Sequence, residues 1–505
     1  MRTFRFGIIA AILTIALACR LYHVTFPVEG WHAWRQADTA DMARNFYDHG
    51  FNIARPQVSH NGDSPSTVDA EFPLFQYLVA LTWAIAGVSD AWGRGISIAS
   101  SLVTLCLLYG FARRYIGENA ALWSAFIYAI LPLNVYYARA FMPNAFVLMW
   151  TMAGLYFYAR WLETNKRPHF FLSAISTSLA VMINPTTLVI GMPLAYLARI
   201  RMGPRWIRTP SLWLYASVAI LPAVAWFTYS RIELYSPQLS IGLWTFGTDK
   251  WGNLDLILTP KFYNDVFLKN IAERHLTYAA TIPFVAGLFL PRQNQEERVF
   301  DWWLVAVILY ILIVAKGNDV HEYYQLPFIL PAVVYVGKIF ARYLTPDQPQ
   351  PAGQRRWRWL FWTCLAGTLI LSGARYAESF ASREIENSPT TRLANEVAAR
   401  TEPGDLLVTV SEGDAVVLYR SHRRGWVLLP GKLDSSAIME KIGLGARYLA
   451  GLKSVLTDEA QRSRFELIRR HFPAVVDDSD YFILSLTEPV LPLLPLPAPA
   501  QPGSH

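Results

Sequence analysis

Long apolar runs alternate with short basic clusters over the first three quarters of the chain. A helix that crosses a membrane needs about 20 mostly apolar residues, and segments approaching this length recur as far as residue 371. We therefore expect about eleven transmembrane helices, because one run is divided into two short helices by Asn184-Pro185. The runs cover residues 6–21, 95–111, 120–137, 144–158, 170–197, 212–228, 276–290, 302–315, 326–340 and 360–371.

The basic clusters predict how these helices are oriented. Lys and Arg are enriched in the cytoplasmic loops of membrane proteins. Arg2 and Arg5 precede the first run, so we expect an uncleaved first helix with a cytoplasmic N-terminus. With eleven spans all the later clusters fall on the same side and the C-terminus lies outside; they are Arg113-Arg114, Arg160 to Arg167, Arg199 to Arg208, Arg292 to Arg298, Arg342 and Arg355 to Arg358.

Two polar segments interrupt the membrane part, which we place at residues 1–372. The first outer loop covers residues 23–92, and its single apolar stretch, residues 72–87, is expected to lie along the membrane interface. The later loop covers residues 229–275. Composition supports a membrane protein, since 53% of residues are hydrophobic and the mean hydropathy is +0.24, above the usual range of soluble domains.

From about residue 373 the pattern changes to short strands alternating with helices. This alternation predicts a small α/β domain outside the membrane, residues 373–490, with a mostly parallel sheet. The Pro-rich tail, residues 491–505, is expected to be disordered. No Gly-rich phosphate motif is found, so we expect no cofactor. The predicted strands are residues 405–410, 425–429, 446–452 and 481–486, and the predicted helices are residues 411–419, 435–442 and 458–472.

Charge and cysteine content exclude several functions. The net charge of +7 is spread over the short clusters between apolar runs, which argues against a nucleic-acid partner. Cys19, Cys106 and Cys364 all lie in apolar runs, so they provide neither a disulfide framework nor a zinc motif.

The polar residues that could take part in chemistry lie at the outer ends of the helices, and three candidate carboxylates lie in the first loop. Apolar residues recur at helical spacing from Asp38 to Tyr47, so Asp38 and Asp41 share one face of an amphipathic helix. Glu71 lies two residues before Pro73. Two interpretations stay open for Asp38 and Glu71: that they take part in catalysis, or that each only caps a helix, Asp38 a helix that starts at Thr39.

Two cationic candidates lie in other outer turns. Arg139 stands in a tight turn, and His321 lies at the outer mouth of a later helix. Either side chain could bind a phosphate, and Arg does so bidentately. Contact with lipid head groups is the alternative for both.

Four segments together resemble the C-type membrane glycosyltransferases, specifically the bacterial relatives of the protein O-mannosyltransferases and the aminoarabinose transferases of lipid A. The resemblance covers about residues 6–340, in the expected order. It implies a GT-C-like fold in the bacterial inner membrane and transfer of a sugar from a polyprenyl-phosphate carrier to a hydroxyl acceptor in the periplasm. The segments are Trp34-Arg-Gln-Ala-Asp-Thr, Glu71-Phe-Pro-Leu-Phe, Tyr137-Ala-Arg-Ala-Phe-Met-Pro and His321-Glu-Tyr-Tyr-Gln-Leu-Pro.

The resemblance also implies roles for individual residues. An acidic residue of the first outer loop acts as the base; Asp38 matches this position best, Asp41 remains possible, and Glu71 matches the second acid. One base and one acceptor imply a single displacement with inversion. The expected substrate-binding residues are Arg35, Arg139, His321, Tyr324, Lys250 and Lys261.

Two departures from the family pattern affect the expected chemistry. Phe72 stands where the aminoarabinose transferases have Lys, so the phosphate contact must come from elsewhere. Asn144 stands where many relatives have Asp, and we therefore expect no metal. Two other functions remain as alternatives: a lipid-linked glycan polymerase or ligase, which would have a large outer loop late in the chain, and a transporter, which would have midplane charges and internal repeats.

Overall fold

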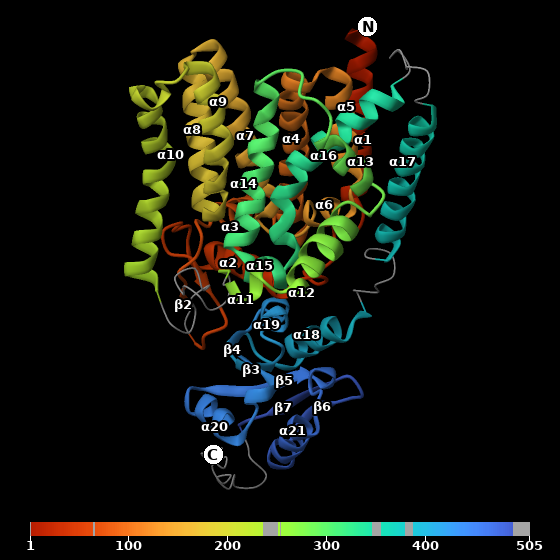
Figure 1. Ribbon diagram of the computed structural model, residues 1–505. Helices are drawn as coiled ribbons and strands as arrows, with labels where there is room; N and C mark the ends of the chain where they lie inside the picture. Colours follow the sequence, from red (N-terminus) through yellow and green to blue (C-terminus); the bar gives the residue numbers. More distant parts are fainter. Residues whose placement is uncertain are drawn as a thin grey trace.

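The computed structural model describes residues 2–63, 66–235, 251–252, 254–345, 355–378 and 387–487. A bundle of helices forms most of the molecule, and a small sheet domain lies at one end of it, opposite the N-terminus (Figure 1). The Pro-rich tail and Lys250 lie outside the described residues.

Every apolar run of the sequence falls on a helix of the bundle. The break at Asn184-Pro185 is confirmed, because the Asn184 side chain caps a 3-10 turn, η1 (Pro185–Ile190), by accepting from the Thr186 N–H. The helices are α1 (Arg2–Leu21), α4 (Asp90–Ile116), α5 (Glu118–Ile130), α6 (Pro132–Tyr137), α7 (Asn144–Thr164), α8 (Arg167–Ile183), α9 (Gly191–Met202), α10 (Pro210–Tyr229), α13 (Thr281–Leu288), α14 (Val299–Ile313), α16 (Leu326–Leu344) and α17 (Arg355–Tyr376).

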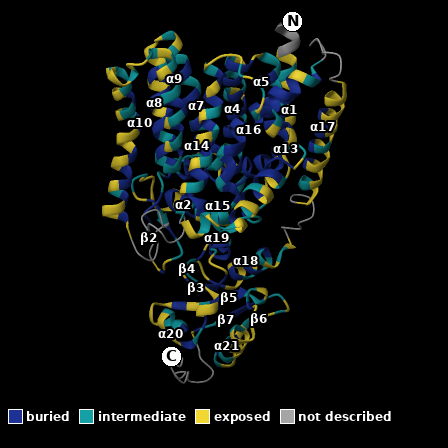
Figure 2. Cartoon of the chain, in the orientation of Figure 1, coloured by how far each residue is buried: buried dark blue, intermediate teal, exposed yellow. Residues whose placement is uncertain are grey.

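Three of these segments are long and apolar enough to cross a membrane by length and composition: Asp90–Ile116, Pro210–Leu234 and Glu322–Leu344. Helices α10 and α17 lie at the sides of the bundle and expose large apolar side chains, among them Trp213, Leu221 and Trp359 (Figure 2). Contiguous exposed apolar surface of this kind is typical of a face that contacts lipid.

The centre of the bundle is α16, which packs against α5. Most of its residues are buried (Figure 2). At Gly337 an added Cβ would lie 2.5 Å from the Ala120 carbonyl oxygen. Small residues allow such close helix contacts in membrane proteins.

The basic connections between helices gather at the end of the bundle away from the sheet domain. Arg114 at the end of α4 pairs with Glu163 at the end of α7. Arg201 of α9 lies 3.4 Å from Glu163 and 3.0 Å from Glu296 before α14. Three of the predicted basic clusters therefore share one face of the molecule.

The first loop forms two helices, α2 (Ala33–His49) and α3 (Leu74–Ala86), and a short hairpin of β1 (Gln57–Val58) and β2 (Ser66–Thr67). Both capping interpretations are wrong. Helix α2 begins at Ala33, so Asp38 lies in its second turn, and Pro73 occupies the N-cap of α3 while Glu71 pairs with Arg35. Helix α2 begins earlier than predicted because Gln36 is buried and held in place. Its side chain donates to the Trp31 carbonyl and accepts from the Phe141 N–H.

The C-terminal domain has a five-stranded sheet with the order β4-β3-β5-β7-β6. The prediction of a mostly parallel sheet is wrong, because β3 pairs in parallel with β4 and β5, whereas β7 is antiparallel to β5 and β6. The elements are α18 (Pro389–Arg400), β3 (Leu406–Val410), α19 (Val416–Ser421), β4 (Arg424–Leu428), α20 (Ser435–Gly443), β5 (Ala446–Leu452), α21 (Glu459–His471), β6 (Ala474–Asp477) and β7 (Tyr481–Ser485).

The edge of this sheet docks on the first loop. Gly62 donates its N–H to the Gly425 carbonyl at 2.7 Å, and Gly425 donates to the Ser59 carbonyl at 3.2 Å. Residues 59–62 thus extend the sheet beyond β4, its edge strand. Arg420 lies 3.2 Å from Glu29, and the Tyr419 hydroxyl donates to Asp90 at 2.5 Å.

Candidate active site

An ion pair joins the two parts of the first loop that the sequence singled out. The Arg35 guanidinium of α2 donates to Glu71, just ahead of α3, at 2.7 Å. Burial opposes the charge on Arg35, but the Glu71 carboxylate outweighs burial and raises the Arg35 pKa above its ordinary value. Arg35 therefore remains a cation in a largely enclosed position.

Asp38 lies one turn after Arg35 and is half-buried. Burial raises its pKa to about 6, although His60 and Arg35 favour the carboxylate; Asp41 and Asp414 favour the protonated form. No hydrogen bond to its side chain is found among the described residues. A carboxyl group with a pKa close to neutral and free oxygens is suited to act as a general base.

Asp41 has different surroundings one turn further along α2. Its Oδ2 accepts the Ser59 N–H at 2.7 Å, and its Oδ1 accepts from the Asn45 amide at 3.3 Å. Burial raises the pKa of Asp41, and Ser59 counteracts this shift. One oxygen holds the neighbouring loop at Ser59 and the other holds Asn45 of the same helix. Asp41 is therefore less available than Asp38 to accept a proton.

His321 and Tyr324 lie beside the beginning of α2. The His321 ring stacks on Tyr324 at 5.7 Å between centroids and lies 5.7 Å from the Trp34 ring. Tyr324 belongs to the short helix η6 (Glu322–Gln325) and is within electrostatic reach of Arg35 and Glu71. The structure therefore gathers Arg35, Asp38, Glu71, His321 and Tyr324 in one region.

A buried carboxylate next to this region was missed from the sequence. Glu322 accepts the Tyr137 hydroxyl at 2.7 Å and lies 3.2 Å from His32 Nε2. His275 lies 3.1 Å from its backbone carbonyl. Glu322 and Tyr137 both stand inside segments that resemble the family, but no local spacing connects them with His32 or His275.

Arg139 lies elsewhere at the same end of the bundle. It donates to the Tyr22 carbonyl at 2.6 Å and its guanidinium covers the Tyr136 ring. Burial, together with Arg94, lowers its pKa to about 10. Its bonds therefore lie at the start of the first loop, not on the Arg35–Glu71 pair.

The remaining predicted positions have other surroundings. Lys261 of α12 (Pro260–Tyr263) is 74% exposed and lies 2.8 Å from Asp265 and 3.9 Å from Asp319. The Phe72 ring packs edge-on against Trp226, so this position is part of an apolar contact. Within the described ranges no three His, Cys, Asp or Glu side chains are grouped so that they could hold a metal ion.

Comparison with known proteins finds similarity to glycosyltransferases. Residues 64–229 match the family described as dolichyl-phosphate-mannose-protein mannosyltransferase. A comparison with curated protein sequences finds no match. The similar solved structures include the following two. ArnT from Cupriavidus metallidurans bound to undecaprenyl phosphate has a TM-score of 0.66 at 12% identity, covering 96% of this chain and 98% of ArnT. The Archaeoglobus fulgidus oligosaccharyltransferase AglB, in complex with an inhibitory peptide and a dolichol-phosphate, has a TM-score of 0.59 at 12% identity, covering 94% and 73%.

The fold is therefore that of the C-type (GT-C) membrane glycosyltransferases. The resemblance to this group of enzymes is confirmed: residues 64–229 match the mannosyltransferase family model, and the whole chain is similar in fold to ArnT.

Proposed function

We propose that the protein is an inverting glycosyltransferase that moves a sugar from a polyprenyl-phosphate carrier to a hydroxyl acceptor. The observation that carries this proposal is Asp38, an unengaged carboxyl group with a pKa of about 6 beside the Arg35–Glu71 pair. The related ArnT structure holds undecaprenyl phosphate and the AglB structure holds a dolichol-phosphate, which supports this class of donor.

The proposed location is the bacterial inner membrane, with about eleven transmembrane helices. The N-terminus and the basic end of the bundle face the cytoplasm. The first loop and the domain of residues 373–490 face the periplasm. The shared face of the clusters around Arg114 and Arg201 supports this orientation.

The reaction needs a base and a stabilised leaving group. Asp38 removes the proton of the acceptor hydroxyl while the hydroxyl oxygen forms a bond to the anomeric carbon. The bond between that carbon and the phosphate oxygen breaks on the opposite side, and the carrier phosphate departs with the electron pair. One displacement inverts the anomeric centre.

The cations of the site stabilise the phosphate as negative charge develops on it. Arg35 is the best placed, since Glu71 both fixes its direction and maintains its charge. His321 and Tyr324 lie beside it and can donate to the phosphate or the sugar. We propose Arg139, Lys261 and Lys250 as further phosphate partners, and we propose that no metal takes part.

The test is to follow the donor in cells. We expect a polyprenyl-phosphate-linked sugar to accumulate when the protein is deleted, and mass spectrometry of lipid extracts would identify it. Wild-type protein should clear this species, whereas Asp38→Asn should clear it roughly 10²–10⁴ times more slowly, the usual contribution of a general base.

Matched variants make this result specific. Glu440→Gln, an exposed carboxylate of α20, should behave as wild type. If Asp38→Asn clears the lipid normally and Asp41→Asn does not, the base is Asp41. If neither variant has an effect at normal expression, the transferase proposal is wrong.

A further inference from the structure

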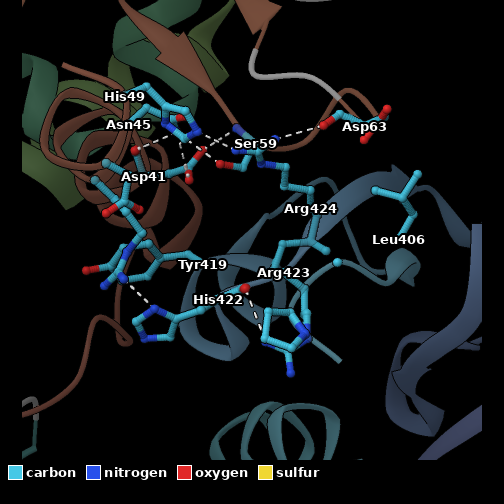
Figure 3. A pocket seen from close by; sticks show the side chains of 15 residues that line it. Asp41, Asn45, His49, Ser59, Asp63, Leu406, Tyr419, His422, Arg423 and Arg424 are labelled. Carbon is cyan, nitrogen blue, oxygen red and sulfur yellow. Dashed lines mark hydrogen bonds between the residues drawn. The ribbon is translucent and has the colours of Figure 1, made fainter. Parts of the chain in front are cut away.

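A cavity of about 220 Å³ lies between α2 and the sheet domain (Figure 3). One wall comes from the first loop and includes Asp41, Arg44 and Asn45. The opposite wall comes from α19 and β4 and includes His422 and Arg424. The cavity therefore exists only because the sheet domain docks on the first loop.

The sheet-domain wall is rigid. Arg423 is buried and donates to the Thr401 hydroxyl at 2.8 Å and to the Thr401 carbonyl at 2.6 Å. Arg424 donates to the Asp63 carbonyl at 2.9 Å and contacts His49. These bonds hold the polar groups in place before any ligand enters, which lowers the cost of binding.

Two buried polar atoms of the first-loop wall have no hydrogen-bond partner among the described residues. They are Oδ1 of Asn45, whose side chain is 3% exposed, and Nε of Arg44. The Asn45 amide nitrogen is fully used, because it donates to the Ser59 hydroxyl at 2.9 Å and to the Asp41 carbonyl at 2.9 Å. One orphan atom is an acceptor and the other a donor, and a hydroxyl group can satisfy either.

The charges that line the cavity and its volume restrict further which kind of ligand it can bind. The lining contains three carboxylates, Asp41, Asp48 and Asp63, and three guanidinium groups, Arg44, Arg423 and Arg424. This balance favours a neutral ligand with many donors and acceptors over an anion or a cation. The volume is below the roughly 300–1,000 Å³ of sites for drug-sized molecules, which suits a single sugar ring.

We propose that this cavity binds one neutral sugar unit of the acceptor, an inference that rests on the proposed transferase function. Asp41 forms part of the wall and stands three residues from Asp38 on α2. A sugar ring in the cavity therefore lies next to the base that would activate its hydroxyl. The acceptor is accordingly a glycan or glycolipid whose terminal unit carries no charge.

The test measures sugar binding directly, so it does not depend on turnover. The full chain is purified in a detergent without a sugar head group. Methyl glycosides of glucose, mannose and galactose are then titrated by saturation-transfer NMR, with inorganic phosphate as the competing probe. At least one glycoside should bind saturably, and phosphate should not displace it.

Variants locate the binding. Arg44→Lys keeps the charge but loses Nε, and Asp48→Asn removes one carboxylate. Each should weaken glycoside binding about fivefold to tenfold, the effect of one lost hydrogen bond. Arg55→Lys, an exposed residue of the same loop outside the cavity, should not change it.

The outcomes separate this inference from the transferase proposal. Absence of saturable glycoside binding, displacement by phosphate, or binding unaffected by the two cavity variants would each overturn the sugar site, even if Asp38→Asn still blocks transfer. Conversely, glycoside binding that depends on Arg44 and Asp48 supports the sugar site whatever the outcome at Asp38.

Discussion

Asp38 and Asp41 stand one turn apart on α2, yet their surroundings give them different chemistry. Asp41 is held by the Ser59 N–H and the Asn45 amide, whereas Asp38 faces His60, Arg35 and Asp414 without such bonds. The spacing of three residues in the sequence shows that both lie on one face. It cannot show which carboxylate is engaged, because Ser59, His60 and Asp414 come from other segments.

The raised pKa of Asp38 predicts a pH profile. The base must be a carboxylate, and the pKa of Asp38 in the folded protein is about 6. Below that value the group is protonated, so kcat/KM should rise about tenfold per pH unit as the pH increases and level off above about 6. Initial rates of sugar transfer in purified protein between pH 4.5 and 8 would show this limb. A rate that stays level down to pH 4.5 would contradict the assignment.

The neutral side chain of Asn144 predicts that sugar transfer does not need a metal ion and proceeds in the presence of a chelator. An amide side chain stands at the beginning of α7, and a neutral amide binds a divalent cation more weakly than a carboxylate does. Transfer by the purified protein in EDTA should match transfer in buffer alone. Loss of transfer in EDTA that magnesium or manganese restores would show that a metal takes part.

Helix positions in the bundle could largely be predicted from apolar runs, since each expected segment overlaps a helix. The run 120–137 nevertheless forms two helices, α5 and α6, and the run 276–290 contains only the short α13. The missed elements are those with a weak pattern. Strand β6 is a four-residue edge strand without a buried residue, and α18 is a short helix of 12 residues with only Leu393, Ala394 and Val397 as buried apolar positions. The start of α2 was also missed, because Gln36 is buried by contacts with Trp31 and Phe141 that no local pattern encodes.

The docking of β4 predicts that one glycine is essential to the first loop. Gly425 has a φ of +152°, and a Cβ there would press directly against the Leu407 carbonyl of β3. Gly425→Ala should therefore displace β4 from both β3 and residues 59–62. We expect a loss of stability of about 1–3 kcal/mol and a fall in transfer, because Ser59 would no longer be positioned to hold Asp41.

Thermal unfolding of the purified protein and the lipid-clearance assay would measure the two effects. Gly431→Ala is the matched control, since a Cβ at that position meets nothing within 4 Å. Equal melting temperatures and equal clearance for the two variants would show that the β4 edge does not support the site.

The first loop lies between the helix bundle and the sheet domain, and it contacts both. Glu71 meets Arg35 across 36 residues of sequence, Glu322 meets His32 across 290, and the Arg424 contact with His49 spans 375. The sequence could predict that the candidates lie at one end of the helices. Their pairing arises only when folding brings these distant segments together, and Arg139 and Lys261 show that residues at this end can have bonding partners outside the Arg35–Glu71 pair.

The arrangement of these parts predicts which face of the molecule meets the cytoplasm. Moving several Arg residues across a membrane is disfavoured, at roughly 2.5–3.5 kcal/mol for each one at a helix centre, so the end with Arg114 and Arg201 should be cytoplasmic. With Cys19, Cys106 and Cys364 replaced by Ala, single cysteines are introduced at three exposed positions, Arg55→Cys in the first loop, Glu412→Cys in the sheet domain and Lys166→Cys at the basic end. A maleimide that cannot cross the inner membrane should label intact cells at positions 55 and 412 but not at 166. Labelling at position 166 instead would show that the membrane topology is inverted. The Asp38 region would then lie in the cytoplasm, which excludes an acceptor in the periplasm.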